Sequence, residues 1–461
     1  MGRARARAVQ RNFFSPALLL LGLTAACGDD ASEPANAGGG SGGVSATGGT
    51  AGSGNAAGSG GDAAAASGGV AGQAGGAGSG GVGGTQSQEL KTFDDIKSGA
   101  TKASDGLLAI AQAGGFPIPS PAGFVFARVD DGKGPYALAG DFNGWTPAPM
   151  QLTQGMYWIS VAVPTPDGAK YKFVDGGQTF AADPYARRYG WDQNGEYSLV
   201  LSSAPHRERF PEMSGNGRPP RTVRLWISQA KPTHHLYTHD GQNLFEPTSI
   251  FGGWKLDQTA GAKTLIVGID NIGAGRMDEY THISDNIGSG PVGGKGDDYA
   301  DFVEQVVRPA VEKRYGTPSK VGVMGSSLGG LIAIHQVLRP PGRYDFAASL
   351  SGTLGWGSFG PHKETLIERF ETAGKQTTKI YLDSGGGPGS GCIDSDSDGI
   401  QDDAAGAKDN YCETVQLRDV LSAAGYTFDT ELWHWYESGA PHSETAWAAR
   451  AFRPLSAFEA L

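Results

Sequence analysis

The sequence predicts two different folds in one chain: an α/β domain on the C-terminal side and an all-β sandwich before it. From residue 221 onward, apolar runs alternate with amphipathic helical segments, a pattern of βαβ units that form a largely parallel sheet. Residues 119–205 instead contain short β-branched and aromatic runs separated by Gly, Pro, Asp and Asn, which is typical of a β-sandwich. Within the α/β part, a Gly-rich corner joins a predicted strand to a predicted helix at 320–338.

The N-terminal residues 1–26 have the composition of an export signal. Four arginines precede an apolar stretch from Ala17 to Leu23, and small residues lead to Cys27. The apolar stretch is too short to span a bilayer as a helix. The segment resembles a bacterial lipoprotein signal, which implies a lipid on Cys27 and a place in the cell envelope, at the outer membrane or cell surface. Thr24 stands where such signals usually have leucine, so plain secretion stays open.

Charge and composition narrow the possible partners of the mature chain. Loss of residues 1–26 removes four arginines and no acid, so the formal net charge falls from -11 to -15, which argues against a nucleic-acid partner. Residues 27–86 are almost only Gly, Ala and Ser and predict a disordered tether with a reach of about 40 Å. Residues 87–118 have apolar residues at helical spacing and predict a short helical lead.

Three segments of the predicted sandwich at 119–205 resemble segments of a known kind of domain. They are LAGDFNGW (138–145), the YKF strand (171–173) and ADPYARR (182–188). These segments resemble the early-set, immunoglobulin-like domain that precedes catalysis in isoamylases and some esterases and is related to glycogen-binding modules. Its tryptophans could stack on sugar rings, although filling the sandwich core and the domain interface is their simpler role. These residues are Trp145, Trp158 and Trp191.

Residues 206–220 are rich in Pro, Gly and Arg and predict a hinge before the α/β domain at 221–461. In that domain the motif Gly325-Ser326-Ser327-Leu328-Gly329 fits G-x-S-x-G, the nucleophile elbow. Small residues let the backbone turn sharply there, so that the serine Oγ stands over the sheet edge. The strand before the motif and the helix after it are the context that this chemistry needs, and they favour Ser327 as a nucleophile.

A serine nucleophile needs a base, and in this kind of fold the partners follow in the order Ser, Asp or Glu, His. Four histidines follow the elbow: His335, His362, His434 and His442. His335 lies in the helix that leaves the elbow, and His434 lies in an apolar strand, where a packing role is simplest. His442 comes after the last predicted strand and before a helix, so it can return over the elbow.

Several segments together resemble the family of esterases related to enterochelin esterases and to carbohydrate esterase family 1. They are LYTHDGQNLF (236–245), VGIDN (267–271), RMDEYTH (276–282), VMGSSLGG, ASLSG, YLDSG and PHSETAW. The resemblance implies an α/β-hydrolase that acts on carboxylic esters and needs no cofactor for catalysis. It also implies Ser327 as nucleophile, His442 as base, and the N–H groups of Leu328 and Gln242 as the oxyanion hole. His282 stands where that family pattern has proline.

A long acidic insert follows the predicted strand at 379–385. Its carboxylates at alternate positions, with Gly399 for a sharp bend, resemble the short calcium loops of extracellular modules. The expected ligands are Asp394, Asp396, Asp398, Ile400 and Asp402, with a solvated acidic loop as the alternative. With Cys27 lipidated, Cys392 and Cys412 are left as one possible disulfide outside the reducing cytosol.

The insert also complicates the identity of the triad acid. Asp383 lies within the strand, where alternation can turn its side chain away from the histidine. Asp394 is less free if it coordinates calcium. A Cys392–Cys412 bridge would return the chain to the strand end beside Asp409, so we expect Asp409 first, Asp383 second and Asp394 third.

Three functions are consistent with the sequence. The leading one is an exported serine ester hydrolase acting on sugar-linked acetyl or feruloyl esters or on siderophore lactones. An acyltransferase would use the same acyl-enzyme, and a cell-surface glycan-binding protein could retain an inactive hydrolase domain. The loops 273–296 and 353–361, with Arg276, Tyr280 and Trp356, either shape the substrate pocket or only pack.

Overall fold

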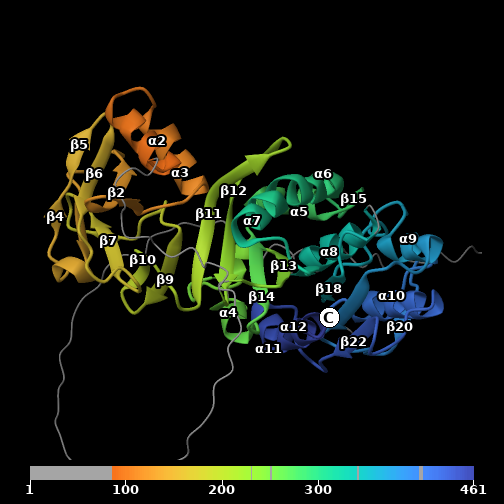
Figure 1. Cartoon of the computed structure of the whole chain (residues 1–461). Coiled ribbons are helices and arrows are strands. Elements are labelled where there is room, and N and C mark those ends of the chain that lie inside the picture. The colour runs from red at the N-terminus through yellow and green to blue at the C-terminus, as the bar shows by residue number, and fades with distance from the viewer. Residues whose placement is uncertain (1–85, 230, 250–251, 340–341, 404–408) are drawn as a thin grey trace, which may run out of the picture. The chain divides into compact units, whose positions relative to one another are not determined.

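The computed structural model describes residues 86–229, 231–249, 252–339, 342–403 and 409–461 (Figure 1). The predicted signal, the tether up to Thr85 and Cys27 lie outside these residues. Within the described part of the chain, no helix is both long and apolar enough to cross a bilayer.

A parallel sheet forms the centre of the C-terminal part, as the alternating pattern predicts. Its six strands pair in the order β22-β19-β18-β17-β13-β14. They are β13 (His234–His239), β14 (Thr264–Ile269), β17 (Lys320–Ser326), β18 (Phe346–Leu350), β19 (Lys379–Ser384) and β22 (Leu432–Tyr436). β13, β14 and β18 are buried at every position, because helices cover both faces of the sheet. The predicted α/β fold is confirmed.

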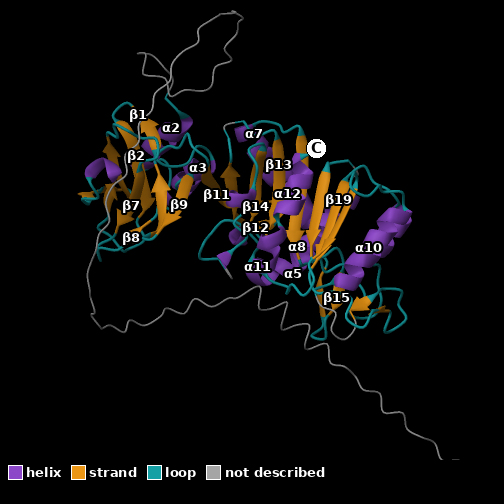
Figure 2. Ribbon diagram, turned by 90° about the horizontal axis from the view of Figure 1, so that it is seen from below, coloured by secondary structure: helices purple, strands orange, loops and turns teal. Residues whose placement is uncertain are grey.

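The helices separate into two groups, which pack in two apolar cores against the sheet (Figure 2). One core contains side chains of α8, α9, α10 and the helical run 296–315, and the other contains side chains of α4, α11 and α12. The bounds are α4 (Leu256–Thr259), α5 (Arg276–Tyr280), α6 (Gly296–Phe302), α7 (Arg308–Tyr315), α8 (Leu328–Leu338), α9 (Leu366–Ala373), α10 (Tyr411–Ala423), α11 (Glu444–Arg450) and α12 (Phe452–Glu459). A π-helical segment, Val303–Val307, joins α6 to α7.

The hinge expected at 206–220 is not present. These residues form β11 (His206–Gly215) and the start of β12 (Arg218–Ile227), an antiparallel hairpin. Asn216 and Gly217 both have positive φ, 51° and 71°, which is what a tight hairpin turn requires. The two prolines of β12 precede Val223, where its pairing with β14 begins, so they interrupt no hydrogen bond to that strand. The Pro and Gly content therefore marks a turn and a strand end, not a linker.

The strands before β11 form two layers around a shared core. One sheet has the order β1-β2-β6-β5, and the other continues the large sheet from β11 through β9-β10-β7-β3-β4. Phe126 and Tyr157 from the first layer share a core with Leu138 and Tyr171 from the second. The bounds are β1 (Ile118–Ser120), β2 (Gly123–Val129), β3 (Ala137–Gly140), β4 (Ala148–Pro149), β5 (Gln151–Thr153), β6 (Met156–Val161), β7 (Lys170–Val174), β8 (Phe180–Ala181), β9 (Arg188–Asp192) and β10 (Gly195–Leu199).

Two helices, α2 (Gln88–Lys97) and α3 (Ala103–Gln112), lie where a helical lead is predicted, and they pack on β1 and β2. Trp158 packs edge to face against Phe93 of α2, with ring centroids 5.5 Å apart. Trp191 packs edge to face on Tyr189 at 5.1 Å, and the Trp145 indole N–H donates to Asp141 at 2.9 Å. Trp158 and Trp191 thus have packing partners, while sugar binding by these tryptophans stays a prediction.

Candidate active site

The predicted elbow is the sharp turn between β17 and α8. Ser327 is the residue at the corner, with φ 55° and ψ -125°, a conformation that costs energy for any residue except glycine. A Cβ on Gly325 would lie 2.4 Å from the backbone of Gly329, so the corner cannot close around a larger residue. Ser327 is 3% exposed, and its backbone N–H donates to the Leu350 carbonyl of the neighbouring strand.

His442 meets Ser327 across the sheet edge. Its Nε2 lies 2.9 Å from the Ser327 Oγ, within hydrogen-bonding distance. His442 follows β22 and precedes α11, whose N-terminus is capped by the Ser443 side chain. The ring of Trp447, from the same helix, packs edge to face against the imidazole at 4.9 Å. The loop, the cap and this ring together fix the direction of the imidazole.

The structure brings one of the three candidate acids to His442. Asp409 Oδ1 lies 2.6 Å from His442 Nδ1, which fits an imidazole that donates from Nδ1–H and accepts from the serine at Nε2. The second carboxylate oxygen of Asp409 accepts from Ser351 Oγ at 2.7 Å and from the Gly385 N–H. Asp394 lies in the insert, where its oxygens accept from the N–H groups of Asp398 and Gly399.

Asp383 is close by but has a different partner. Its Oδ1 accepts from Arg450 Nε at 2.8 Å, and its Oδ2 accepts from Tyr381 O–H at 3.1 Å. Burial raises the pKa of Asp383 to about 6 even though the Arg450 guanidinium opposes this. Arg450 also donates from Nη2 to Ser351 Oγ, so it links Asp383 to the group that holds Asp409.

Sequence reasoning missed the residues behind Asp409. Ser351 donates to Asp409 and accepts from the Trp447 indole N–H at 2.9 Å. Trp447 and Arg450 are three residues apart on α11 and therefore share one face of that helix. That spacing is the only local signal of their shared role, since their partners come from segments far away in the sequence.

The turn after β13 carries Gln242, the second predicted oxyanion donor besides Leu328. Gln242 lies in a 3₁₀ turn, Gly241–Asn243, and its side-chain carbonyl accepts from the Asn271 N–H at 3.1 Å. Leu328 is the first residue of α8, a position where the backbone N–H has no partner within the helix. Asp240 directly precedes this turn, and a Cβ on Gly329, the second residue of α8, would lie only 3.1 Å from the Asp240 side chain. The turn therefore lies close to the start of α8.

Asp240 anchors the same turn to α5. Both of its oxygens accept from Arg276, each at 2.8 Å, in a bidentate ion pair. Burial alone would raise the pKa of Asp240, but the Arg276 guanidinium outweighs it and holds the pKa below its usual range. Arg276, one of the residues expected to shape the substrate pocket, therefore orients the Asp240–Asn243 turn. Trp356, another of them, is fully buried and donates to the Ile283 carbonyl.

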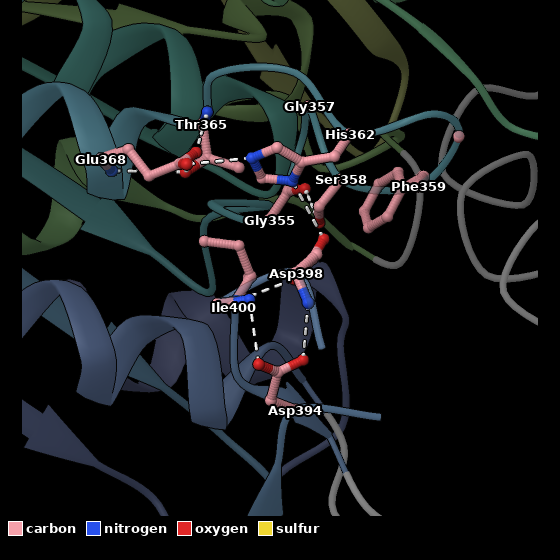
Figure 3. A network of polar contacts seen from close by, with 12 residues as sticks. Gly355, Gly357, Ser358, Phe359, His362, Thr365, Glu368, Asp394, Asp398 and Ile400 are labelled. Carbon is pink, nitrogen blue, oxygen red and sulfur yellow. Dashed lines mark hydrogen bonds and ion pairs between the residues drawn. The ribbon is translucent and has the colours of Figure 1, made fainter. Parts of the chain in front are cut away.

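The other histidines have partners away from Ser327. His335 Nε2 lies 2.8 Å from Asp297, and burial lowers the pKa of His434 to about 4. His362 bridges Glu368 at 2.9 Å and Asp398 at 3.2 Å, which connects the loop before α9 to the acidic insert (Figure 3). None of these three has a recorded contact with Ser327 in the described part of the chain.

The acidic insert brings together three of its five expected calcium ligands. Asp394, Asp396 and Asp398 each offer an oxygen within 4.8 Å of the others. Asp402 instead accepts from Ser395, through both the N–H and the hydroxyl. Ile400 could contribute only its backbone carbonyl. Partial burial and then the neighbouring carboxylates raise the pKa of Asp396, so a cation would relieve repulsion here. Three clustered carboxylates are oxygen ligands of the kind that calcium prefers.

A disulfide joins Cys392 and Cys412 at the base of the insert. Cys392 begins the short strand β20 (Cys392–Ile393), which pairs with β21 (Asp402–Asp403), while Cys412 lies in the first turn of α10. Asp409 comes three residues before Cys412, with φ 70°. The bridge therefore holds the chain next to the residue that contacts His442.

A second hairpin, β15 (Ser284–Asn286) and β16 (Pro291–Gly293), lies in the loop after α5.

Comparison with known proteins gives one family and several distant relatives. The model of the Esterase family, described as "Putative esterase", matches residues 214–453. Siderophore triacetylfusarinine C esterase of Aspergillus fumigatus is 38% identical over 71 residues, which is 15% of this chain and 24% of the relative. Uncharacterized protein YbbA of Bacillus subtilis is 28% identical over 126 residues, 26% of this chain and 49% of the relative. The chain thus spans about a quarter of the length of the first relative and about half of the length of the second.

Among solved structures, the enterobactin esterase FES of Shigella flexneri superposes with a TM-score of 0.40 and 15% identity. The superposition covers 73% of this chain and 93% of that one.

Proposed function

Because the chain belongs to the Esterase family, we propose that it is a carboxylic ester hydrolase that works through an acyl-enzyme at Ser327. The observation that carries this proposal is the hydrogen-bonded series Ser327 Oγ, His442 and Asp409, with distances of 2.9 and 2.6 Å. The strained corner at Ser327 presents the hydroxyl at the start of a helix, which is where an acyl-transfer nucleophile acts.

In the proposed reaction, Ser327 Oγ attacks the ester carbonyl carbon while His442 Nε2 takes the hydroxyl proton. Asp409 stabilises the imidazolium that forms and keeps the Nδ1–H directed toward itself. The N–H groups of Leu328 and Gln242 stabilise the oxyanion. His442 then gives its proton to the leaving alcohol, and a water, activated in the same way, releases the acid and restores Ser327.

The substrate is proposed to be an ester of a natural product or a sugar. The similarity to siderophore triacetylfusarinine C esterase makes siderophore esters the first class to test, ahead of acetyl and feruloyl esters of sugars. A panel of these three classes with equal detection limits would rank them by kcat/KM. An added sugar acceptor would show whether acyl transfer competes with hydrolysis.

A fluorophosphonate probe tests the nucleophile without knowledge of the substrate. We expect one probe per chain, bound to the tryptic peptide that contains Ser327, because only an activated serine reacts quickly with such phosphorus centres. Labelling should be lost in Ser327→Ala and slow strongly in His442→Ala. Labelling that persists in Ser327→Ala, or that maps to Ser326, would contradict the assignment.

Outside the catalytic part, three further features are proposed. Residues 1–26 act as an export signal with lipid attached at Cys27, and residues 27–86 act as a tether, on the composition of these segments alone. The two-layered strands at 119–205 form an immunoglobulin-like domain, which their shared core supports. Mass spectrometry of the N-terminal peptide from membranes would detect the lipid on Cys27.

Calcium at Asp394, Asp396 and Asp398 is proposed to stabilise the insert together with the Cys392–Cys412 disulfide. At calcium 100-fold above Kd, binding adds about 2.7 kcal/mol to the free energy of unfolding, and the disulfide adds roughly 3 kcal/mol. The thermal midpoint should therefore fall with chelator and, separately, with reductant. Asp396→Asn is the matched control, because it should remove the response to chelator and keep the response to reductant. A midpoint that chelator does not move would show that the loop is only solvated.

A further inference from the structure

Glu444 is a buried acid that the proposed reaction does not use. It is the first residue of α11, two residues after His442, and it is 4% exposed. One carboxylate oxygen accepts from Asn243 Nδ2 at 2.7 Å, and the other accepts from the Trp254 indole N–H. Both donors are uncharged, although a buried carboxylate usually has a cation as its partner. A carboxylate kept in such a place needs a reason other than stability.

The two donors belong to the oxyanion turn and its support. Asn243 is the last residue of the 3₁₀ turn that carries Gln242. The Trp254 backbone N–H donates to the Asn243 carbonyl at 2.8 Å, so these two residues are also joined to each other. Asp240 and Asn271 hold the other end of the turn. Glu444 therefore makes a polar contact between the histidine side of the site and the oxyanion side, next to the ring contact of Trp254 with Trp447.

We propose that Glu444 is a positioning residue that holds the Gly241–Asn243 turn in its reactive place relative to Ser327 and His442. The inference rests on the proposed ester hydrolysis and adds a residue to it. Glu444 touches no reacting atom in this arrangement. Its loss would let the turn move out of its reactive position, which weakens transition-state stabilisation more than it weakens substrate binding.

The contact is strongest with an ionised carboxylate. Both oxygens accept from N–H donors, and a proton on either oxygen would weaken the hydrogen bond that this oxygen accepts, because a neutral carboxyl is a poorer acceptor than a carboxylate. Burial raises the pKa of Glu444 to about 7, and the nearby Asp240 adds to this while Arg276 opposes it. The raised pKa means that Glu444 is ionised above about pH 8 and protonated below about pH 6. The turn is then held at high pH and released at low pH.

The test compares kcat of wild type with kcat of Glu444→Gln from pH 5.5 to pH 8.5. We expect wild type to be about tenfold faster at pH 8.5, the effect of losing one buried charged acceptor, and less than about threefold faster at pH 5.5, with KM within about twofold throughout. Exposed Glu371→Gln on α9 is the control for charge and should match wild type at every pH.

A second measurement needs no substrate. The ¹⁵N-indole resonance of Trp254, assigned by its loss in Trp254→Phe, should titrate near pH 7 in wild type and stay constant in Glu444→Gln. A pH-independent kcat ratio, or an indole resonance that does not titrate, would overturn the role of Glu444 even if wild type hydrolyses esters. Wild type without any ester turnover would instead overturn the proposed function, so the two failures are distinguishable.

Discussion

Ser327→Ala should lower the turnover of a short-chain aryl ester by three or more orders of magnitude. The hydroxyl supplies the protein atom that bonds to the acyl carbon in the proposed reaction, so its loss leaves oxyanion stabilisation and binding alone. Because alanine occupies the same strained corner, with φ 55°, the fold should change little. The measurement is kcat/KM with p-nitrophenyl acetate, alongside the thermal midpoint of both proteins.

His442→Ala is the partner experiment. In the proposed reaction the Ser327 Oγ gives its proton to His442 Nε2, which lies 2.9 Å away, so this variant should lose about as much activity as Ser327→Ala. The double variant should lose little more than either single one, since the two residues act as a unit. Folded Ser327→Ala protein with wild-type turnover would exclude the serine mechanism.

Asp409→Asn should reduce turnover by roughly 10³- to 10⁴-fold with the fold intact. An amide at this position can present an N–H to His442 Nδ1, which would favour the tautomer that cannot accept the serine proton. It also cannot stabilise the imidazolium. The loss should appear mainly in kcat, because Asp409 is buried behind the histidine and away from bound substrate.

Asp383→Asn is the matched control, since Asp383 is also a buried acid and shares the Arg450 guanidinium with Asp409. It holds Arg450 and not His442, so we expect a fall in the thermal midpoint and a much smaller loss of turnover than for Asp409→Asn. Near-normal turnover in Asp409→Asn together with an inactive, folded Asp383→Asn would reverse the assignment. The insert would then be purely structural.

Much of the candidate site could be predicted because its signals are local. The strand, corner and helix around Ser327 lie within 19 residues, and the chain order of such sites selects His442, which lies 2.9 Å from the serine. The resemblance to esterases is confirmed by the family match over 214–453. The prediction of Asp409 depends on the disulfide between Cys392 and Cys412, because this bridge returns the chain to the strand end next to Asp409. The catalytic roles themselves stay predictions.

The remaining residues could not be predicted because their partners are distant in the sequence. Glu444 contacts Asn243 across 201 residues, and Arg450 contacts Asp383 across 67. The spacing of apolar residues in a sequence predicts helices and strands, but it does not predict contacts between side chains so far apart in the chain. The segment 206–220 was predicted wrongly although its signal is local. Asn216-Gly217 is a strong hairpin signal, but the surrounding prolines and arginines favoured a hinge.

The hairpin of β11 and β12 also has a consequence for how the chain can be divided. The hairpin continues one hydrogen-bonded sheet from the parallel strands at β14 to the N-terminal strands at β9. A recombinant fragment that begins at 221 would lack β11 and leave β12 as a bare edge, with the buried Val223 and Leu225 next to unpaired backbone groups. Such an edge is a template for pairing between chains and hence for aggregation. In the whole chain the N-terminal strands cover this edge, so we expect a fragment that keeps β9 to β12 paired to stay soluble where one that begins at 221 aggregates.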